Sequence, residues 1–259
     1  MTGTHATMAE LAGHRAVVTG ASRNLGAEIA LRLAASGTAV AVNYRSSRDE
    51  AEVVVASLPD VDHGRHLAVG GDVSDPSDSE RIIAEAKRAL DGPIDILVNN
   101  AGPYIAKPFL ELEEGEFDRV WNVKAKATYL MTRAAAPGMK DHGWGRIVNL
   151  SASSAYVRNR SIYTLANAAI ITLTEELALE LAPEILVNAI APGQIYESLG
   201  ELREKAPEWA EKVMNSTPRG RLVTRRELAD MVVLLCSPVF DSVTGVTVPV
   251  DGGLRLNTF

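Results

Sequence analysis

The stretch Arg15-Ala16-Val17-Val18-Thr19-Gly20-Ala21-Ser22-Arg23-Asn24-Leu25-Gly26 decides the fold class of this chain. Its first five residues have the apolar, β-branched composition of a buried strand. A helix is predicted over about 24–36, ending at Gly37. A glycine-rich turn between strand and helix lets backbone N–H groups approach a pyrophosphate. Plain strand-to-helix connections have the same composition, so the rest of the chain must decide between the two.

The alternation of strand and helix continues along the chain. Short apolar runs predict strands over 38–42, 66–69, 94–98, 145–150, 185–190 and 246–250, and longer segments predict helices over about 48–57, 76–90, 115–136 and 162–181. Alternation with apolar strands is typical of a parallel sheet with helices on both faces. We therefore predict an α/β fold with a doubly wound sheet of about seven strands, which binds its ligand at their carboxyl ends.

Composition narrows the function classes. The 259 residues contain no linker or repeat, so we predict a flexible N-terminus over 1–12 and one domain over 13–259. A net charge of −7 argues against nucleic-acid and anionic-membrane partners. Cys236 is the only cysteine and lies in an apolar run, which favours core packing and a reducing cytoplasm. We expect no signal peptide, no membrane span and no metal site.

Five motifs follow in order at the predicted strand ends and in one helix. They are Gly71-Asp72-Val73, Asn99-Asn100-Ala101-Gly102, Trp121-Asn122-Val123, Pro192-Gly193 and Asp251-Gly252-Gly253. With the glycine turn, they resemble the short-chain dehydrogenase/reductase family from about residue 13 to 255, and most of all its 3-oxoacyl-reductase-like branch. The resemblance implies a single Rossmann-type domain, a nicotinamide cofactor and a homodimer or homotetramer.

The resemblance also assigns the cofactor contacts. It implies that Asp72 and Val73 hold the adenine, that Asn99 holds the adenosine ribose, and that Gly193 and Ile195 lie against the nicotinamide. Asn24 replaces the middle glycine of the turn, and Asn tolerates positive φ better than most residues. The expected cofactor-binding residues are Gly20, Ser22, Arg23, Asn24, Leu25, Gly26, Arg45, Ser46, Asp72, Val73, Asn99, Ala101, Gly102, Tyr163, Pro192, Gly193 and Ile195.

The segment after the second strand bears on the choice of cofactor. An acid at this place would bind the ribose hydroxyls of NAD and repel a 2′-phosphate. The chain instead reads Asn43-Tyr44-Arg45-Ser46-Ser47. Arg45 can pair with a 2′-phosphate, Ser46 can add a hydrogen bond, and Arg23 can reach the same group. We predict NADP(H) over NAD(H), the alternative being that both arginines are only solvated.

The run Tyr163-Thr164-Leu165-Ala166-Asn167 departs from the family pattern. The family has Tyr followed four residues later by Lys, and residues so spaced project from one helix face. Family members combine Asn, Ser, Tyr and Lys; here Asn122 and Tyr163 match, and Asn167 stands in place of Lys. The next Lys after Tyr163 is Lys205, well beyond the helix. Arg158 and Arg160 are nearby cations, but they are also typical exposed residues.

The serine position departs as well. The strand end reads Leu150-Ser151-Ala152-Ser153-Ser154, which puts Ala152 at the family's catalytic serine position. The segment to Tyr163 is about two residues shorter than in the family, so Ser153 or Ser151 can supply the hydroxyl, and we rank Ser153 first. Glu197 replaces the Thr that often follows Pro-Gly. It is expected to act in the substrate pocket or to face water.

Three functions fit these departures. The intact cofactor motifs favour an NADP(H)-dependent carbonyl reductase in which Tyr163 is the acid and Asn167 bonds the ribose. A neutral Tyr can still protonate a carbonyl oxygen, so loss of the Lys should harm alcohol oxidation most. The changed Ser and Lys positions also fit a non-redox cyclase, isomerase or dehydratase. A catalytically inactive regulatory protein that binds NADP(H) is the third reading.

The region 194–225 is expected to form a substrate lid. Its apolar residues Tyr196, Leu199, Trp209 and Met214 predict a medium-sized, partly apolar substrate, or else pack the lid itself. Small residues along the helices over 115–136 and 162–181 permit close helix packing, and the family builds its dimer from these helices. We therefore expect a homodimer or homotetramer.

Overall fold

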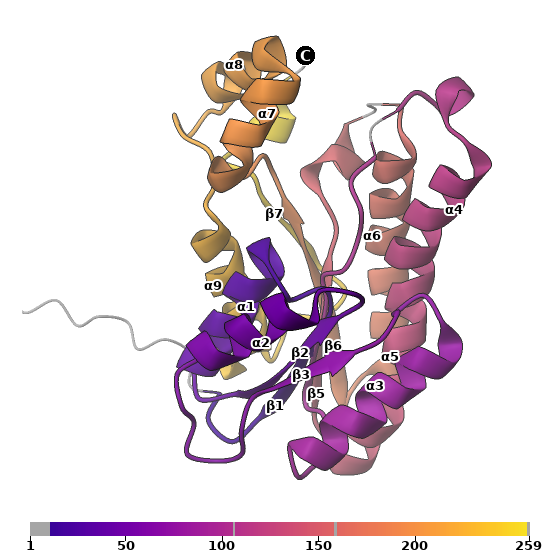
Figure 1. Cartoon of the computed structure of the whole chain (residues 1–259), viewed down its shortest axis with the longest axis vertical. Coiled ribbons are helices and arrows are strands. Elements are labelled where there is room, and N and C mark those ends of the chain that lie inside the picture. Colours follow the sequence, from indigo (N-terminus) through magenta and orange to yellow (C-terminus); the bar gives the residue numbers. More distant parts are fainter. Residues whose placement is uncertain (1–10, 106, 158–159, 258–259) are drawn as a thin grey trace, which may run out of the picture.

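Seven parallel strands form the centre of the molecule, in the order β3-β2-β1-β4-β5-β6-β7 (Figure 1). This computed structural model describes residues 11–105, 107–157 and 160–257; the predicted flexible terminus lies almost entirely outside them. All seven predicted strands are confirmed, with ends displaced by at most two residues. They are β1 (Arg15–Val18), β2 (Ala39–Tyr44), β3 (Leu67–Gly70), β4 (Ile96–Asn99), β5 (Gly145–Leu150), β6 (Ile185–Pro192) and β7 (Thr247–Val250).

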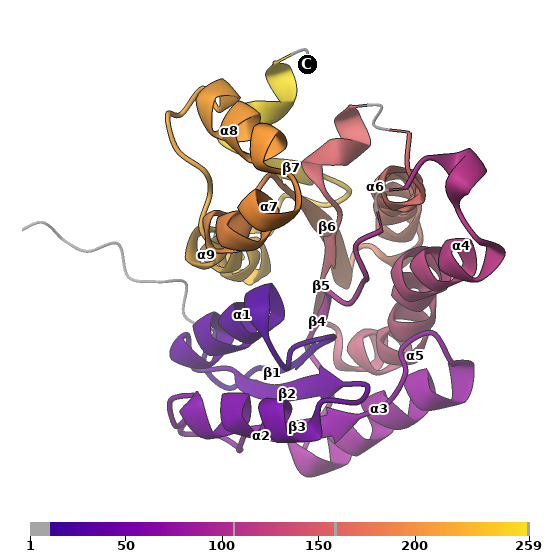
Figure 2. The same cartoon turned by 45° about the horizontal axis from the view of Figure 1, so that its top comes forward.

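Helices cover both faces of the sheet, as predicted (Figure 2). One face carries α1 (Asn24–Ala35), α2 (Arg48–Ser57) and α9 (Arg225–Cys236), and the other carries α3 (Pro76–Ala89), α5 (Ala127–His142) and α6 (Ile162–Leu181). Each face has its own apolar core against the strands. Helix α9 is not among the helices that the sequence patterns predict. It begins in a capping box between Thr224 and Glu227, and it buries Cys236, as expected of a core residue.

The predicted single helix over 115–136 is wrong in one respect. The segment consists of α4 (Glu114–Trp121), a π-helical turn η2 (Asn122–Lys126) and α5. Within it, the backbone N–H of Ala127 donates to the carbonyl of Asn122, five residues earlier. A π turn adds one residue to the helix and shifts the direction of the side chains around it; such turns are frequent at functional sites. This one contains the predicted catalytic Asn122.

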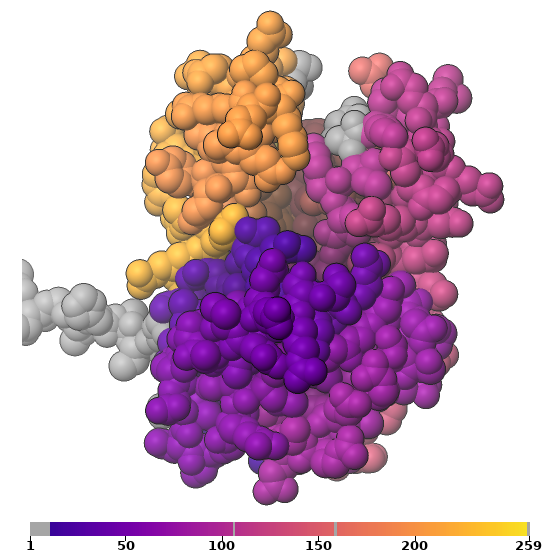
Figure 3. All heavy atoms as spheres, viewed as in Figure 1, coloured from indigo at the N-terminus to yellow at the C-terminus, as the bar shows by residue number. Residues whose placement is uncertain are grey.

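Two short helices stand beyond the carboxyl ends of the strands. They are α7 (Leu199–Lys205) and α8 (Pro207–Ser216), which lie within the predicted lid. The space-filling view shows a hollow between these helices and the segment around α4 (Figure 3). Leu199 and Met214 pack in a small cluster within the lid, whereas Tyr196 and Trp209 are exposed. The predicted lid segment therefore buries part of its apolar surface internally and leaves part exposed.

Helix α6 corrects one expectation. By length and composition it could cross a membrane, although no such stretch was expected from the sequence. In the fold it packs against β5, β6 and α5 and contributes eight buried residues, among them Asn167 and Thr174. The hydroxyl of Thr174 donates to the carbonyl of Ile170 and accepts from the Asn149 side chain. Its packing is that of a core helix.

Candidate active site

The turn between β1 and α1 is held by side chains from neighbouring strand ends. The amide of Asn100 donates to the carbonyls of Thr19 and Gly20 at 2.9 and 3.1 Å. The hydroxyl of Thr19 accepts from the backbone N–H of Asn100 at 2.9 Å. The side-chain oxygen of Asn43 accepts from the N–H of Gly20 at 3.3 Å. The glycine turn and the Asn-Asn-Ala-Gly motif are thus one rigid unit at the carboxyl ends of β1 and β4.

The start of α1 fits a bound phosphate group. Arg23 occupies the N-cap position without a side-chain hydrogen bond to the helix, and the first turn carries no acid. Its free N–H groups and the helix dipole favour an anion. Asn24 has φ of 54°, the left-handed conformation expected of it. A Cβ on Gly26 would lie 2.5 Å from the carbonyl oxygen of Gly20, so only glycine allows this close packing.

The candidate phosphate-binding arginines already have acidic neighbours. The Arg45 guanidinium lies 3.7 Å from the Asp72 carboxylate, and that of Arg23 lies 3.5 Å from Glu50. Both arginines are more than half exposed, so these pairs contribute little to stability. The first pair places the Arg45 guanidinium at the end of β2, beside Asp72, the residue expected to hold the adenine. Ser46 is exposed next to Arg45.

Other motif residues meet at the same end of the sheet. Gly193, after β6, packs so tightly on Asp251 that an added Cβ would lie 2.7 Å from the Asp251 Cβ. Ile195 follows and bridges to Val223. The side chain of Asn99 faces the interior, where its amide donates to Asn149 at 2.9 Å. Any contact of Asn99 with a ribose would therefore come through its backbone or after an exchange of partners.

Tyr163 and Asn167 lie one turn apart in α6, and Asn167 is the centre of a buried network. Its side-chain amide donates to the backbone carbonyl of Tyr163 at 2.8 Å, and its backbone carbonyl accepts from the Ser151 hydroxyl at 2.8 Å. Its side chain is fully buried. The predicted hydrogen bond from Asn167 to a ribose would require this amide to exchange partners. The Tyr163 ring is partly exposed and meets Tyr104 edge to face, with ring centroids 4.9 Å apart.

Lys124 supplies a cation that the sequence patterns did not place at the site. It lies in the π turn η2, and only 6% of its surface is exposed. Its Nζ donates to the side-chain oxygen of Asn167 at 3.0 Å and to the carbonyl of Leu150 at 3.1 Å. The same Nζ lies 5.5 Å from the centroid of the Tyr163 ring. An ammonium thus reaches the tyrosine from another element.

Burial shifts the pKa of Tyr163 and that of Lys124 in the direction that favours the uncharged form of each side chain. Burial raises the pKa of Tyr163 to about 12, and the nearby Asn167 side chain acts against that rise. Burial lowers the pKa of Lys124 to about 8. At neutral pH the phenol is therefore a neutral proton donor, and the amine remains mostly protonated. No ion pair joins Lys124 to a carboxylate within the described ranges.

The serines at the end of β5 have different surroundings. Ser151 is buried and its hydroxyl is engaged with Asn167. Ala152, at the family's serine position, is extended and buried. Ser153 begins the short 3-10 helix η3 (Ser153–Tyr156), which packs against α6. The structure gives the Ser153 hydroxyl no hydrogen bond to another described residue, so it is the better candidate to bind a substrate.

Glu197 has a role that neither sequence expectation included. Its carboxylate oxygens accept from the backbone N–H of Arg225 at 3.1 and 3.2 Å, at the first residue of α9. An anion there complements the helix N-terminus.

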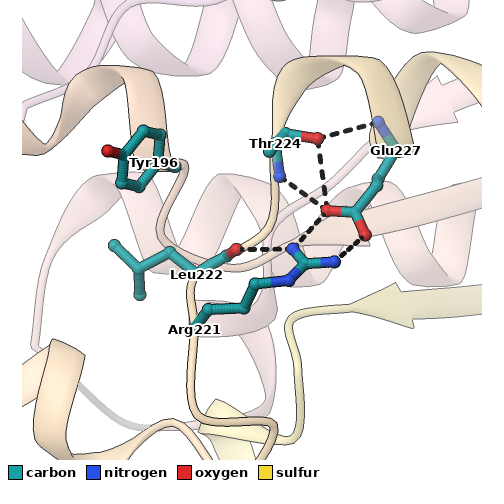
Figure 4. A pocket seen from close by; sticks show the side chains of 5 residues that line it. All are labelled: Tyr196, Arg221, Leu222, Thr224 and Glu227. Atoms are coloured by element: carbon teal, nitrogen blue, oxygen red, sulfur yellow. Dashed lines mark hydrogen bonds and ion pairs between the residues drawn. The ribbon is translucent and has the colours of Figure 1, made fainter.

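A cavity of about 430 Å³ lies alongside, lined by Tyr196, Arg221, Leu222, Thr224 and Glu227 (Figure 4). The Arg221 guanidinium is bound by both oxygens of Glu227 at 2.9 and 2.6 Å, so the cavity's charges are mutually paired.

The other residues considered for the site from the sequence lie on different elements. Asn122 lies in η2 with its carbonyl engaged in the π turn. Arg160 is exposed, and Arg158 lies outside the described residues. The signal that could have revealed Lys124 is a lysine between Val123 and Ala125, in a helical segment whose neighbours are apolar. In a regular α-helix, positions two apart do not share a face, so nothing linked Lys124 to Asn122 before the π turn was known.

Comparisons with known proteins agree on one family. The sequence profile described as enoyl-(acyl carrier protein) reductase matches residues 20–255. The L-xylulose reductase of Mesocricetus auratus is 34% identical over 247 residues, covering 94% of this chain and 97% of that protein. The 3-oxoacyl-[acyl-carrier-protein] reductase FabG of Staphylococcus aureus is 35% identical over 246 residues, covering 93% of this chain and 98% of that protein.

Solved structures agree with this family and fold. A short-chain dehydrogenase/reductase from Serratia marcescens has a TM-score of 0.85 at 32% identity, covering 95% of this chain and 99% of its own. A 7α-hydroxysteroid dehydrogenase complexed with NADH and 7-oxo glycochenodeoxycholic acid has a TM-score of 0.87 at 31% identity. That match covers 94% of this chain and 95% of the other.

Proposed function

Because this chain belongs to the short-chain dehydrogenase/reductase family of NAD(P)-dependent oxidoreductases, we propose that it is an NADP(H)-dependent carbonyl reductase with an altered catalytic tetrad. The observation that carries the proposal is the partly exposed, neutral phenol of Tyr163, placed beside the buried Asn167 and Lys124. When bound, the reduced nicotinamide supplies a hydride, with its two electrons, to the carbonyl carbon.

Tyr163 supplies the proton in this proposal. As the carbonyl carbon gains a hydride, its oxygen gains charge and takes the phenolic proton, so that the ketone becomes an alcohol. A pKa near 12 keeps the proton on Tyr163 until that charge develops. The same shift disfavours the phenolate that alcohol oxidation would need as a base. The environment of Tyr163 thus supports the reductive direction.

The substrate is bound by the other residues at the end of β5 and by the lid. Ser153 donates a hydrogen bond to the carbonyl oxygen, and Ser151 holds the backbone of Asn167 instead. The exposed rings of Tyr104, Tyr196 and Trp209 offer apolar surface. Such a surface suits a medium-sized, partly apolar carbonyl compound. Asn122 keeps the role that the family resemblance gives it, holding the water that connects the site to solvent.

The cofactor is NADP(H) rather than NAD(H). The end of β2 offers Arg45 and Ser46 and no acid, and Arg23 stands nearby at the start of α1. In this proposal the 2′-phosphate replaces the Asp72 carboxylate as a partner of Arg45, a weak surface contact that is easily exchanged. The phosphates of the dinucleotide lie over the glycine turn, at the N-terminus of α1.

The protein is a cytoplasmic homodimer or homotetramer in this proposal. Large apolar side chains are exposed on α4, α5 and α6, the elements that the family uses for its dimer. They are Phe117, Trp121, Tyr129 and Leu165. Exposed apolar side chains gathered on neighbouring helices are typical of an interface. Light scattering that shows only a 27.7 kDa species would contradict this part of the proposal.

Two measurements test the proposal. Titration with NADPH and with NADH, followed by nicotinamide fluorescence, should show tighter binding of NADPH. Oxidation of NADPH in the presence of carbonyl probes, such as 9,10-phenanthrenequinone and ethyl acetoacetate, should then depend on the protein. If the protein binds neither nucleotide, the reductase proposal is wrong. Binding without hydride transfer to any probe would favour a regulatory protein.

A further inference from the structure

Lys124 is a buried cation that the tetrad of the family does not include. Its ammonium is enclosed by Asn167, Leu150 and the Tyr163 ring, and its stem packs on Gly102, where an added Cβ would lie 2.5 Å from the Lys124 Cε. Within the described residues its polar partners are uncharged oxygens. Burial of an ammonium without a carboxylate is unfavourable, so such a group is more typical of function than of stability.

The atoms around Asn167 permit only one arrangement. Lysine can only donate, and the backbone carbonyl of Tyr163 can only accept. The amide oxygen of Asn167 must therefore face Lys124, and its NH₂ group must face Tyr163, as the structure has them. Asn167 thus fixes the position of the ammonium beside the Tyr163 ring. A lysine at position 167 would compete with Lys124 for this space and add a like charge.

We propose that Lys124, reaching the site from the π turn with Asn167 as its hydrogen-bonding partner, is the positioning residue that replaces the family's lysine in stabilising charge on Tyr163. The inference rests on the proposed reductase function for its role in turnover. The phenol becomes negatively charged as it gives its proton to the substrate oxygen. An ammonium on the face of its ring lowers the free energy of that charge without taking part in any bond change.

The surroundings of Lys124 define the pH dependence that follows. From α6 it faces Tyr163 and Asn167, from β5 the carbonyl of Leu150, and across Tyr163 the phenol of Tyr104. Of these, Tyr163 and Tyr104 titrate, and both have a raised pKa. Lys124 is therefore the first of the group to lose its charge as the pH rises. Reduction by the wild type should weaken above pH about 8.

The test compares four variants with the wild type. Lys124→Met removes the charge, Lys124→Arg keeps it, and Lys124→Met combined with Asn167→Lys returns it to the family's position. Lys126→Met is the matched control, because Lys126 lies in the same π turn but is exposed. For Lys124→Met we expect a loss of about ten- to 100-fold in kcat/KM with 9,10-phenanthrenequinone, corresponding to roughly one to two pKa units of lost phenolate stabilisation. The decline of the rate above pH about 8 should disappear with it.

The rescue variants separate charge from structure. Lys124→Arg should keep most of the rate and carry it to higher pH, and the double variant should recover at least part of it. NADPH affinity should be unchanged in Lys124→Met, Lys124→Arg and Lys126→Met, since neither lysine is among the residues expected to bind the cofactor. A Lys124→Met variant with the wild-type rate and pH profile would overturn the inference. If that variant fails to fold, a Lys124→Arg enzyme with an unaltered pH profile overturns it equally.

A second readout needs neither cofactor nor substrate. Ultraviolet absorbance of tyrosinate during alkaline titration of the free protein, compared with Tyr163→Phe, isolates the ionisation of Tyr163. Lys124 has already lost its charge in this pH range, so the informative variant is Lys124→Arg, whose guanidinium stays charged. It should lower this pKa by about one unit or more, and Lys126→Arg should leave it unchanged. No change with Lys124→Arg overturns the inference. If the protein proves not to be a reductase, this titration still shows whether Lys124 and Tyr163 are coupled, so the two failures are distinct.

Discussion

The side-chain oxygen of Asn167 accepts a hydrogen bond from the Nζ of Lys124 at 3.0 Å, although 43 residues separate them in the sequence. Because of this contact, the Asn in place of the family's lysine does not leave the tyrosine helix without a nearby cation. A helix that lacks its lysine would leave Tyr163 without a cation, but the neighbouring π turn provides one 5.5 Å from the ring centre. In our proposal, Lys124 supplies the charge that the family resemblance places on the tyrosine helix.

Replacement of Tyr163 by Phe should abolish most of the carbonyl reduction. The loss should be about 10²–10⁴-fold in kcat, because general acid catalysis contributes this much. NADPH binding should change little. Tyr104→Phe is the control, since it keeps the ring that meets Tyr163 edge to face and removes only a hydroxyl. A Tyr163→Phe enzyme with the wild-type rate would mean that another group donates the proton.

The free energy of unfolding should depend on pH through Lys124. Its pKa is about 8 in the folded protein and ordinarily 10.5. Between these values the unfolded chain binds a proton that the folded protein lacks, so stability rises with pH across this window. Relative to Lys124→Met, the wild type should gain about 3 kcal/mol between pH about 8 and 10.5. Urea denaturation of both proteins across this range measures it; parallel pH curves would contradict the lowered pKa.

Arg45→Ala should weaken NADPH binding about ten- to 100-fold, the value of one or two charge-assisted hydrogen bonds. NADH binding should change little or improve, because the removed guanidinium serves only the 2′-phosphate. Arg48→Ala is the matched control: Arg48 is exposed nearby and pairs with Glu52 at 2.7 Å on its own helix. Equal loss of NADH and NADPH affinity in Arg45→Ala would contradict the predicted cofactor preference.

Glu197→Gln tests whether this carboxylate is catalytic or structural. Because it binds the N–H of Arg225 at the start of α9, its neutralisation should lower the free energy of unfolding by about 0.3–1 kcal/mol. The pH profile of carbonyl reduction should keep its shape. Thermal denaturation measures the change in stability, and a pH series of rates measures the profile. Disappearance of one limb of the pH–rate profile would show that Glu197 takes part in the chemistry.

Asn24→Ala should destabilise the protein by about 1–2 kcal/mol, because alanine pays a steric cost at φ of 54°. Asn24→Gly should not, since glycine adopts this conformation freely. Both variants retain the backbone N–H groups of the turn, so differences in NADPH affinity should follow the order of stability. Equal stability of the two variants would mean that the turn relaxes to another conformation.

Local patterns predicted most of the fold. The seven strands are short apolar runs between turn residues, and β1 with its glycine turn depends only on neighbours in sequence. The π turn was not predictable in this way, since no residue in Asn122–Lys126 differs in helix preference enough to mark an added residue. Helix α9 was missed because it follows a segment read as a lid, which ends where its capping box begins.

The site was predictable where one element carries it, and not where elements meet. Tyr163 and Asn167 share a helix face, so their spacing alone placed them together. Lys124 reaches them only because α6 packs beside η2, a contact that no sequence spacing encodes. The same holds for Glu197, whose partner Arg225 lies 28 residues away at the start of α9.

The most direct test of the account is a single-turnover measurement of NADPH oxidation by excess wild-type protein with 9,10-phenanthrenequinone, repeated with Tyr163→Phe. We expect the nicotinamide absorbance to decay in the wild type with formation of the reduced probe, and to decay at least about 100-fold more slowly in Tyr163→Phe. No decay in the wild type, despite bound NADPH, would contradict a reductase with Tyr163 as its acid.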